Sequence, residues 1–105
     1  MARYGTETSL PPRRVLRLAR EFFGPESDWG LALSSDSLTA IGFHGAGGSI
    51  EVSASPRVAN SALTEVTILS REFDPAAEEF LGELARVGRG PGLIARAMRR
   101  IFPRR

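Results

Sequence analysis

The side chains that carry most nucleophilic, acid–base and metal chemistry in proteins are scarce in this sequence. It has one histidine, His44, and neither cysteine nor lysine. The lack of cysteine excludes disulfides, thiolate nucleophiles and cysteine-bound zinc. The lack of lysine excludes Schiff-base chemistry and a phosphate-binding P-loop. Serines and three aspartates (Asp28, Asp36 and Asp74) could complete a serine–histidine–aspartate arrangement, but no Gly-x-Ser-x-Gly motif supports one. We therefore expect no catalytic activity, no cofactor and no metal.

Two further groups of residues are of types found in phosphate-binding or acid–base sites, but their positions in the predicted elements do not suit those roles. Residues 45–48, Gly-Ala-Gly-Gly, lie between two strand-like runs, whereas a phosphate cradle has to open a helix. This run therefore predicts a hairpin turn, and His44 is expected to be a polar residue flanking it. Glu78 and Glu79 are adjacent on a predicted helix and do not face each other. We expect both of them in solvent.

Arginine is the residue type through which the chain could bind an anion. All fourteen basic residues are arginine, and charge is segregated into +3 over residues 1–23, −8 over 24–85 and +7 over 86–105. Arg13 and Arg14 fall in the first turn of a predicted helix, where the helix dipole disfavours cations by about 0.3–1 kcal/mol each. They are screened by solvent, neutralised by the acidic middle block, or kept as a patch for an anionic partner. Exclusive use of arginine is compatible with a GC-rich genome or a hot habitat, and the absence of glutamine and cysteine leaves few thermolabile residues, as in heat-adapted proteins.

The basic C-terminal block predicts a short amphipathic helix. Residues 93–102 place apolar side chains at helical spacing with arginines on the opposite side, after a glycine- and proline-rich linker over 88–92. Three roles remain open: packing on the sheet or on a partner's helix, contact with nucleic-acid phosphates, or binding to an anionic membrane surface. The candidate interface residues in this segment are Leu93, Ile94, Met98, Ile101 and Phe102. The candidate anion-binding residues are Arg96, Arg99, Arg100, Arg104 and Arg105.

The rest of the pattern predicts one domain over residues 1–87, with 88–105 as its basic extension. A strand over 2–8 leads to a helix that starts at the prolines Pro11 and Pro12 and ends at Gly24. Strand-like runs follow around residues 29–33, 38–44, 50–54 and 62–73, joined by short links at 34–37, 45–48 and 56–61 that are typical of antiparallel hairpins. A second helix has Asp74 as its N-cap, Pro75 as its first residue and Gly88 at its end. The fold class is thus α+β, an antiparallel sheet in a β-α-β-β-β-β-α chain with two helices on one face and a basic C-terminal helix.

Two of the predicted strands carry apolar residues on both faces. In the run 62–73, Leu63, Leu69 and Phe73 oppose Val66 and Ile68. The run 38–44 has the same conflict. A bulge could exchange the two faces locally. Otherwise the second face of the sheet is partly apolar, and we expect the C-terminal helix or a second subunit to cover it, in preference to an apolar ligand. Leu63, Leu69 and Phe73 are therefore further candidate interface residues.

The start of the first helix carries a resemblance to known families. Residues 9–16, Ser-Leu-Pro-Pro-Arg-Arg-Val-Leu, follow a threonine-rich strand and resemble the opening of helix-grip, START-like proteins. The order of elements up to residue 87 is also similar to one repeat of the TATA-binding-protein-like fold. The extra strands of a full helix-grip domain are missing, which argues against a large ligand cavity. DNA-binding sheets of the second family are basic, whereas the sheet-bearing block here carries −8 and repels phosphate.

Length and composition complete the prediction. A chain of 105 residues that is 42% hydrophobic and 25% charged fits one soluble domain. No apolar run reaches the roughly 18 residues of a membrane span, and we expect a cytoplasmic protein. We expect a self-associating, non-catalytic module for protein interaction or small-ligand binding, whose partner is a second copy in a homodimer or another protein. The alternative is a binder of nucleic acid or anionic membrane through its C-terminal arginines.

Overall fold

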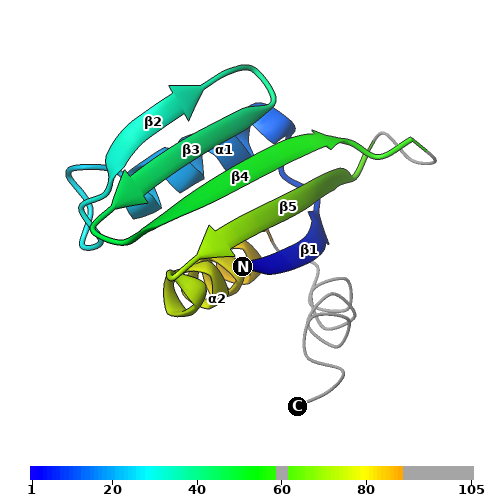
Figure 1. The fold of residues 1–105 in the computed structure, drawn as a ribbon. Coiled ribbons are helices and arrows are strands. Elements are labelled where there is room, and N and C mark those ends of the chain that lie inside the picture. The colour runs from blue at the N-terminus through cyan, green and yellow to red at the C-terminus, as the bar shows by residue number, and fades with distance from the viewer. Residues whose placement is uncertain (59–61, 89–105) are drawn as a thin grey trace, which may run out of the picture.

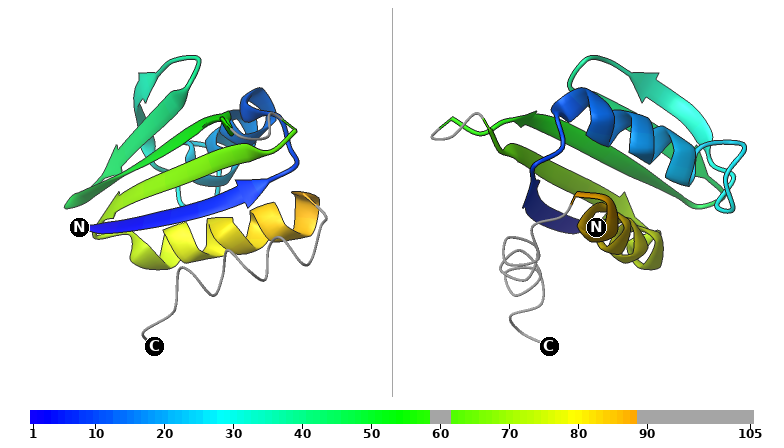
Figure 2. Two further views of the ribbon diagram at one scale, coloured as in Figure 1. Left: turned by 90° about the vertical axis from the view of Figure 1, so that its right-hand side faces the viewer. Right: turned by 180° about the vertical axis from the view of Figure 1, so that it is seen from behind.

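A computed structural model describes residues 1–58 and 62–88 of the chain. Its elements in chain order are β1 (Ala2–Thr8), α1 (Pro12–Phe23), β2 (Ala32–Asp36), β3 (Ala40–Gly45), β4 (Gly48–Pro56), β5 (Thr64–Arg71) and α2 (Asp74–Gly88). The strands form one antiparallel sheet in the order β1-β5-β4-β3-β2, and both helices cover the same face of it (Figures 1 and 2). The predicted fold class is confirmed. The predicted C-terminal helix lies outside the described residues.

Alternation of apolar and polar side chains explains why the central strands lie where they do. In β4 the buried residues Ile50, Val52 and Ala54 alternate with more exposed serines and Glu51. In β5 the buried residues Val66 and Ile68 follow the same period of two. Because successive side chains of a strand point to opposite faces, each strand turns one face to the helices and the other to solvent.

The two helices begin and end close to where the sequence predicts. The carbonyl of Pro11 accepts hydrogen bonds from the amides of Arg14 and Val15, at 2.9 and 3.1 Å, and α1 ends where the Gly24 amide donates to the Arg20 carbonyl at 2.9 Å. In α2 the amide of Ala77 donates to the carbonyl of Phe73 at 3.0 Å. Phe73 therefore occupies the cap position predicted for Asp74, which becomes the first helical residue. Neither helix of the described residues is long and apolar enough to cross a membrane.

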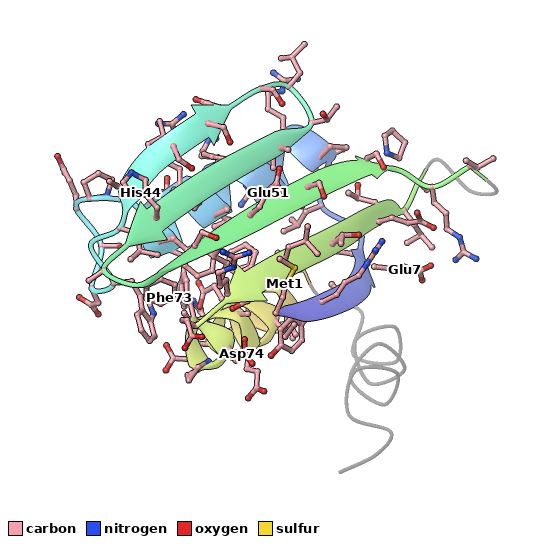
Figure 3. All side chains as sticks on the ribbon, viewed as in Figure 1. Met1, Glu7, His44, Glu51, Phe73 and Asp74 are labelled. Atoms are coloured by element: carbon pink, nitrogen blue, oxygen red, sulfur yellow. The ribbon has the colours of Figure 1, made fainter. Side chains whose placement is uncertain are left out.

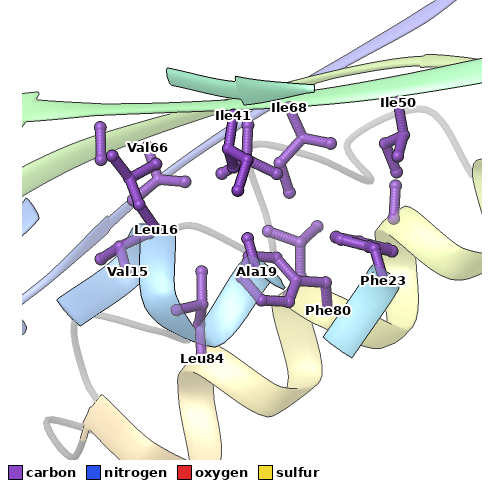
Figure 4. Close-up of a cluster of buried hydrophobic side chains, with 14 of the residues drawn as sticks. Val15, Leu16, Ala19, Phe23, Ile41, Ile50, Val66, Ile68, Phe80 and Leu84 are labelled. Atoms are coloured by element: carbon purple, nitrogen blue, oxygen red, sulfur yellow. The ribbon is translucent and has the colours of Figure 1, made fainter. Parts of the chain in front are cut away.

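The hydrophobic core fills the space between the sheet and the two helices (Figure 4). Helix α1 packs on β3 and β4, while α2 packs on β1 and β5, and the helices touch each other. Three fully buried aromatic rings join these layers: Phe23 of α1, Phe43 of β3 and Phe80 of α2. The ring of Phe23 lies 5.6 Å from that of Phe43 and 5.2 Å from that of Phe80. This aromatic cluster fixes both helices against the sheet.

The second strand lies three residues later than the sequence predicts. Residues 34–36, expected in a turn, belong to β2, whereas Trp29 and Leu31 precede it. Gly30 has a φ of 60° and the Leu31 amide donates to the Phe23 carbonyl at 2.9 Å, so this stretch is tied to the end of α1 instead of the sheet. The turn falls at Ser37–Thr39, where Leu38 is 93% exposed. Leu38 is therefore no part of a strand face, which removes the conflict in residues 38–44.

The apparent conflict in the run 62–73 has a similar origin. Leu63 precedes β5 and Phe73 follows it, after a turn at Glu72 with a φ of 71°. Phe73 packs against the core cluster and lies edge-on to Trp29, with ring centres 6.4 Å apart. Only Leu69 remains on the open face of β5, and it is half-buried. The expectation that Leu63 and Phe73 stand on a strand face was wrong, because the strand is shorter than the apolar run.

The open face of the sheet is consequently polar in character. Figure 3 shows His44 and Glu51 on this face, turned away from the helices. Ser49, Ser53 and Thr67 share the face by their register with these strands. At its β1 edge the carboxylate of Glu7 accepts a hydrogen bond from the guanidinium of Arg57 at 2.5 Å. Small hydroxyls and mixed charges therefore dominate the face that the helices leave uncovered.

Candidate functional site

The described residues contain a groove between α1 and the β2–β3 end of the sheet, with a volume of about 240 Å³. We call it the arginine groove. Three arginines of α1 form one wall, the turn after β2 forms the other, and apolar side chains contribute from both helix and sheet. Its lining residues are Arg13, Leu16, Arg17, Arg20, Asp36, Ser37, Leu38 and Ile41.

Helical periodicity explains why the three arginines share one wall. Arg13, Arg17 and Arg20 are spaced at i, i+4 and i+7, which places them along one flank of α1. The buried stripe of the same helix, centred on Val15 and Ala19, is turned to the sheet. Because α1 packs on β3 and β4, its arginine flank faces the outer strand β2.

The charges of this wall are only partly neutralised. Arg20 forms an ion pair with Asp36 at the end of β2. The guanidinium groups of Arg13 and Arg17 are exposed and have no hydrogen-bond or ion-pair partner among residues 1–58 and 62–88. The first turn of α1 also contains no acidic residue. The acidic middle block therefore neutralises Arg20, while the positive end of the helix and two free guanidinium groups leave the groove positive.

Strand β2 borders the groove as an edge of the sheet. Among the described strands it pairs only with β3, and all five of its residues are exposed. Its pairing shifts register between Leu33 and Ser35, which leaves Ser34 as a bulge. An edge strand offers backbone amides and carbonyls that no neighbour occupies. The arrangement thus combines a backbone edge, two free guanidinium groups and an apolar floor, which suits an extended segment with acidic side chains.

The candidate interface residues predicted from sequence are not brought together. Leu63 and Phe73 flank opposite ends of β5, and Leu69 stands on the open face. The other candidates, Leu93, Ile94, Met98, Ile101 and Phe102, lie outside the described residues, as do Arg96, Arg99, Arg100, Arg104 and Arg105. Their roles stay predictions.

The residues that the sequence offered for catalysis or phosphate binding lie in a strand and a hairpin turn. His44 is exposed in β3 and is paired across the sheet with Ser49. The run 45–48 is the predicted hairpin, with Ala46 and Gly47 in the turn and a φ of 80° at Gly47. Among the described residues, no three histidine, aspartate or glutamate side chains gather to hold a metal ion.

Sequence reasoning found part of the arginine groove and missed the rest. It singled out Arg13 and Arg14 as a possible patch, but Arg14 does not line the groove. The i, i+4, i+7 spacing of Arg13, Arg17 and Arg20 was a readable signal. Asp36 was assigned to a turn, and its pairing with Arg20 depends on where β2 lies against α1.

No protein-family model matches the chain, and the searches of curated proteins and of solved structures found no match either.

Proposed function

We propose that this protein is a non-catalytic interaction module that binds an acidic, extended segment of a partner protein in the arginine groove. The observation that carries the proposal is the juxtaposition of two unpaired arginines, Arg13 and Arg17, with the exposed edge strand β2. Neither element alone would select a ligand. Together they supply backbone pairing for an added strand and positive charge for its side chains.

The geometry of strand addition explains how the two parts act on one ligand. A strand added to β2 presents alternate side chains to the helix side of the sheet. Asp36 already faces that side, since it reaches Arg20 on α1. Acidic side chains of the added strand would meet Arg13 and Arg17 there, and guanidinium groups bind carboxylates with two parallel hydrogen bonds. Leu38, at the mouth of the groove, gives an apolar contact.

Peptide binding tests this proposal directly. A fluorescent peptide of alternating glutamate and valine is expected to bind the full chain, and its lysine–valine counterpart is not. Changing Arg13→Glu and Arg17→Glu together should weaken binding about fourfold or more, because each reversal replaces an exposed ion pair of about 0.2–1 kcal/mol with a repulsion of similar size. Fluorescence anisotropy measures both affinities.

Arg14→Glu is the matched control. It reverses one charge on the same helix, against two in the double variant, but Arg14 lies outside the groove, and the affinity should change less than about twofold once salt screens distant charges. Equal losses of peptide affinity in the Arg14 variant and in the double variant would contradict binding at a defined site. Equal binding of the acidic and basic peptides would contradict the charge complementarity.

The remaining expectations concern parts of the chain or conditions beyond this groove. Homodimer formation, a cytoplasmic location and the resemblance to helix-grip or TATA-binding-protein-like proteins stay predictions. So does the alternative function, binding of nucleic acid or anionic membrane by the C-terminal arginines. That alternative is favoured by the charge of +7 over residues 86–105. It predicts steep salt dependence, with a log–log slope of about −4.5 for five phosphate contacts on duplex DNA.

A further inference from the structure

A second groove lies between the two helices, on the side of the molecule away from the sheet. Helices α1 and α2 contact each other there, with the rings of Phe22 and Phe80 5.5 Å apart, and both lie on the same side of the sheet (Figure 2, right). Two adjoining hollows of about 120 and 290 Å³ share Glu21 and Phe22. We call them together the acidic groove. Its lining residues are Leu18, Glu21, Phe22, Ser27, Asp28, Trp29, Glu79 and Glu83.

The floor of the acidic groove is apolar and incompletely covered. Leu18, Phe22 and Trp29 are half-buried and pack against the core cluster. The ring of Phe22 lies 5.0 Å from that of Phe23 and 5.5 Å from that of Phe80. The rings beneath are fully buried, so the outer surfaces of these three side chains form an apolar strip over the core.

The walls of the acidic groove carry negative charge. Glu21, Asp28 and Glu79 are exposed and have no ion-pair partner among residues 1–58 and 62–88, whereas Glu83 pairs with Arg86 at 2.5 Å. An apolar floor between acidic walls is complementary to an amphipathic helix whose borders carry cations. The arginine groove, on the other flank of α1, has the opposite charge.

We propose that residues 93–102 of the same chain dock in the acidic groove. This segment has an apolar stripe at helical spacing, and if it forms the predicted helix, Arg100 borders that stripe while Arg96 and Arg99 lie on the opposite side. Six arginines and no acidic residue follow Gly88. The open face of the sheet offers a poorer surface, because Leu69 is its one large apolar side chain among the described strands.

The length of the linker permits docking within one chain. The four residues 89–92 span up to about 13 Å when extended. Glu83 lies about 7.5 Å before Gly88 along α2, at 1.5 Å per helical residue. The segment can therefore reverse direction and run back along α2. Ten helical residues are about 15 Å long, which matches the stretch of α2 between Glu83 and Asp74.

Trp29 provides a native reporter for this docking. It is the sole tryptophan of the chain and lines the acidic groove. In the full chain, Ile94→Asp or Met98→Asp should release the segment and raise quenching of tryptophan fluorescence by acrylamide about twofold. Gly90→Asp makes the same charge change in the linker, outside the apolar stripe, and should leave quenching unchanged. Equal quenching in all of these proteins would overturn the proposal.

A second pair of variants separates docking from a nonspecific effect of the segment. The double variant Glu21→Arg, Glu79→Arg should raise quenching of Trp29. Adding Ile94→Asp to it should have no further effect, because the groove variant and the segment variant each remove the same docking interaction. Glu51→Arg with Glu65→Arg places the same charges on the open face and should leave quenching as in the native chain. Additive effects would overturn the proposal, as would quenching that changes with protein concentration, since the segment would then dock on a second copy.

None of these variants changes a residue that lines the arginine groove. Failure of this proposal can therefore be distinguished from failure of peptide binding in that groove.

Discussion

Replacing Phe23 with alanine is expected to lower the free energy of unfolding by about 3–5 kcal/mol. Phe23 is fully buried at the end of α1, where its ring contacts Phe22, Phe43 and Phe80 at centre distances of 5.0–5.6 Å. Those residues lie on α1, β3 and α2, so the cavity left by the ring would loosen all three elements at once. Small domains have total stabilities of about 5–15 kcal/mol, and the loss is therefore a large part of the whole.

Urea unfolding of the full chain, followed by circular dichroism, measures this loss. Leu38→Ala is the control, because Leu38 is 93% exposed in the turn after β2; it should change stability by less than about 0.5 kcal/mol. If the Phe23 variant has the same midpoint urea concentration of unfolding as the unchanged protein, the aromatic cluster does not hold the helices on the sheet.

A second large loss of stability is expected for Gly48→Ala. A Cβ at Gly48 would overlap the carbonyl oxygen of Arg71 and lie 2.8 Å from the Cβ of Glu72. Backbone atoms cannot move aside as the end of a flexible side chain can, so β4 and the β5–α2 turn would have to separate. We expect a cost of about 2–3 kcal/mol, at the upper end of overpacking effects. The same urea experiment measures it.

Gly82→Ala is the matched comparison for Gly48→Ala. Gly82 lies within α2, and a Cβ there meets nothing within 4 Å. Alanine should stabilise the protein by about 0.5–1 kcal/mol, because glycine loses more backbone entropy than alanine in a helix. The two substitutions add the same methyl group with opposite expected signs. Similar losses from both would show that the close approach at Gly48 is not what constrains that position.

Most of the fold could be predicted because its strands and helices have clear local periodicity. The alternation in β4 and the prolines and glycines at the helix ends mark those elements in the sequence itself. The placement of β2 could not be predicted in the same way. Trp29, Leu31 and Leu33 alternate as they would in a strand. Trp29 and Leu31 instead pack in or against the hydrophobic core, and the Leu31 amide donates a hydrogen bond to the carbonyl of Phe23 at the end of α1. Tertiary packing overrides local alternation at this point.

The candidate sites were predictable only in part, for a related reason. Helical spacing alone places Arg13, Arg17 and Arg20 on one flank of α1. That the flank faces an edge strand depends on the sheet order, in which β2 is outermost. The acidic groove joins residues more than fifty positions apart, such as Glu21 and Glu79. Local sequence patterns cannot predict a contact between residues that are so far apart in the chain.

The pairing of β1 with β5 has a consequence for how the chain folds during synthesis. β1 is the earliest of the described strands to be made, yet among them it pairs only with β5, which begins 56 residues after β1 ends. At elongation rates of about 5–20 residues per second, that interval lasts roughly 3–11 s. Until β5 emerges, the first strand has no partner and α2 has no β1–β5 surface to pack on. Nascent chains shorter than residue 71 should therefore remain open to proteases and chaperones, and the sheet should close late and cooperatively.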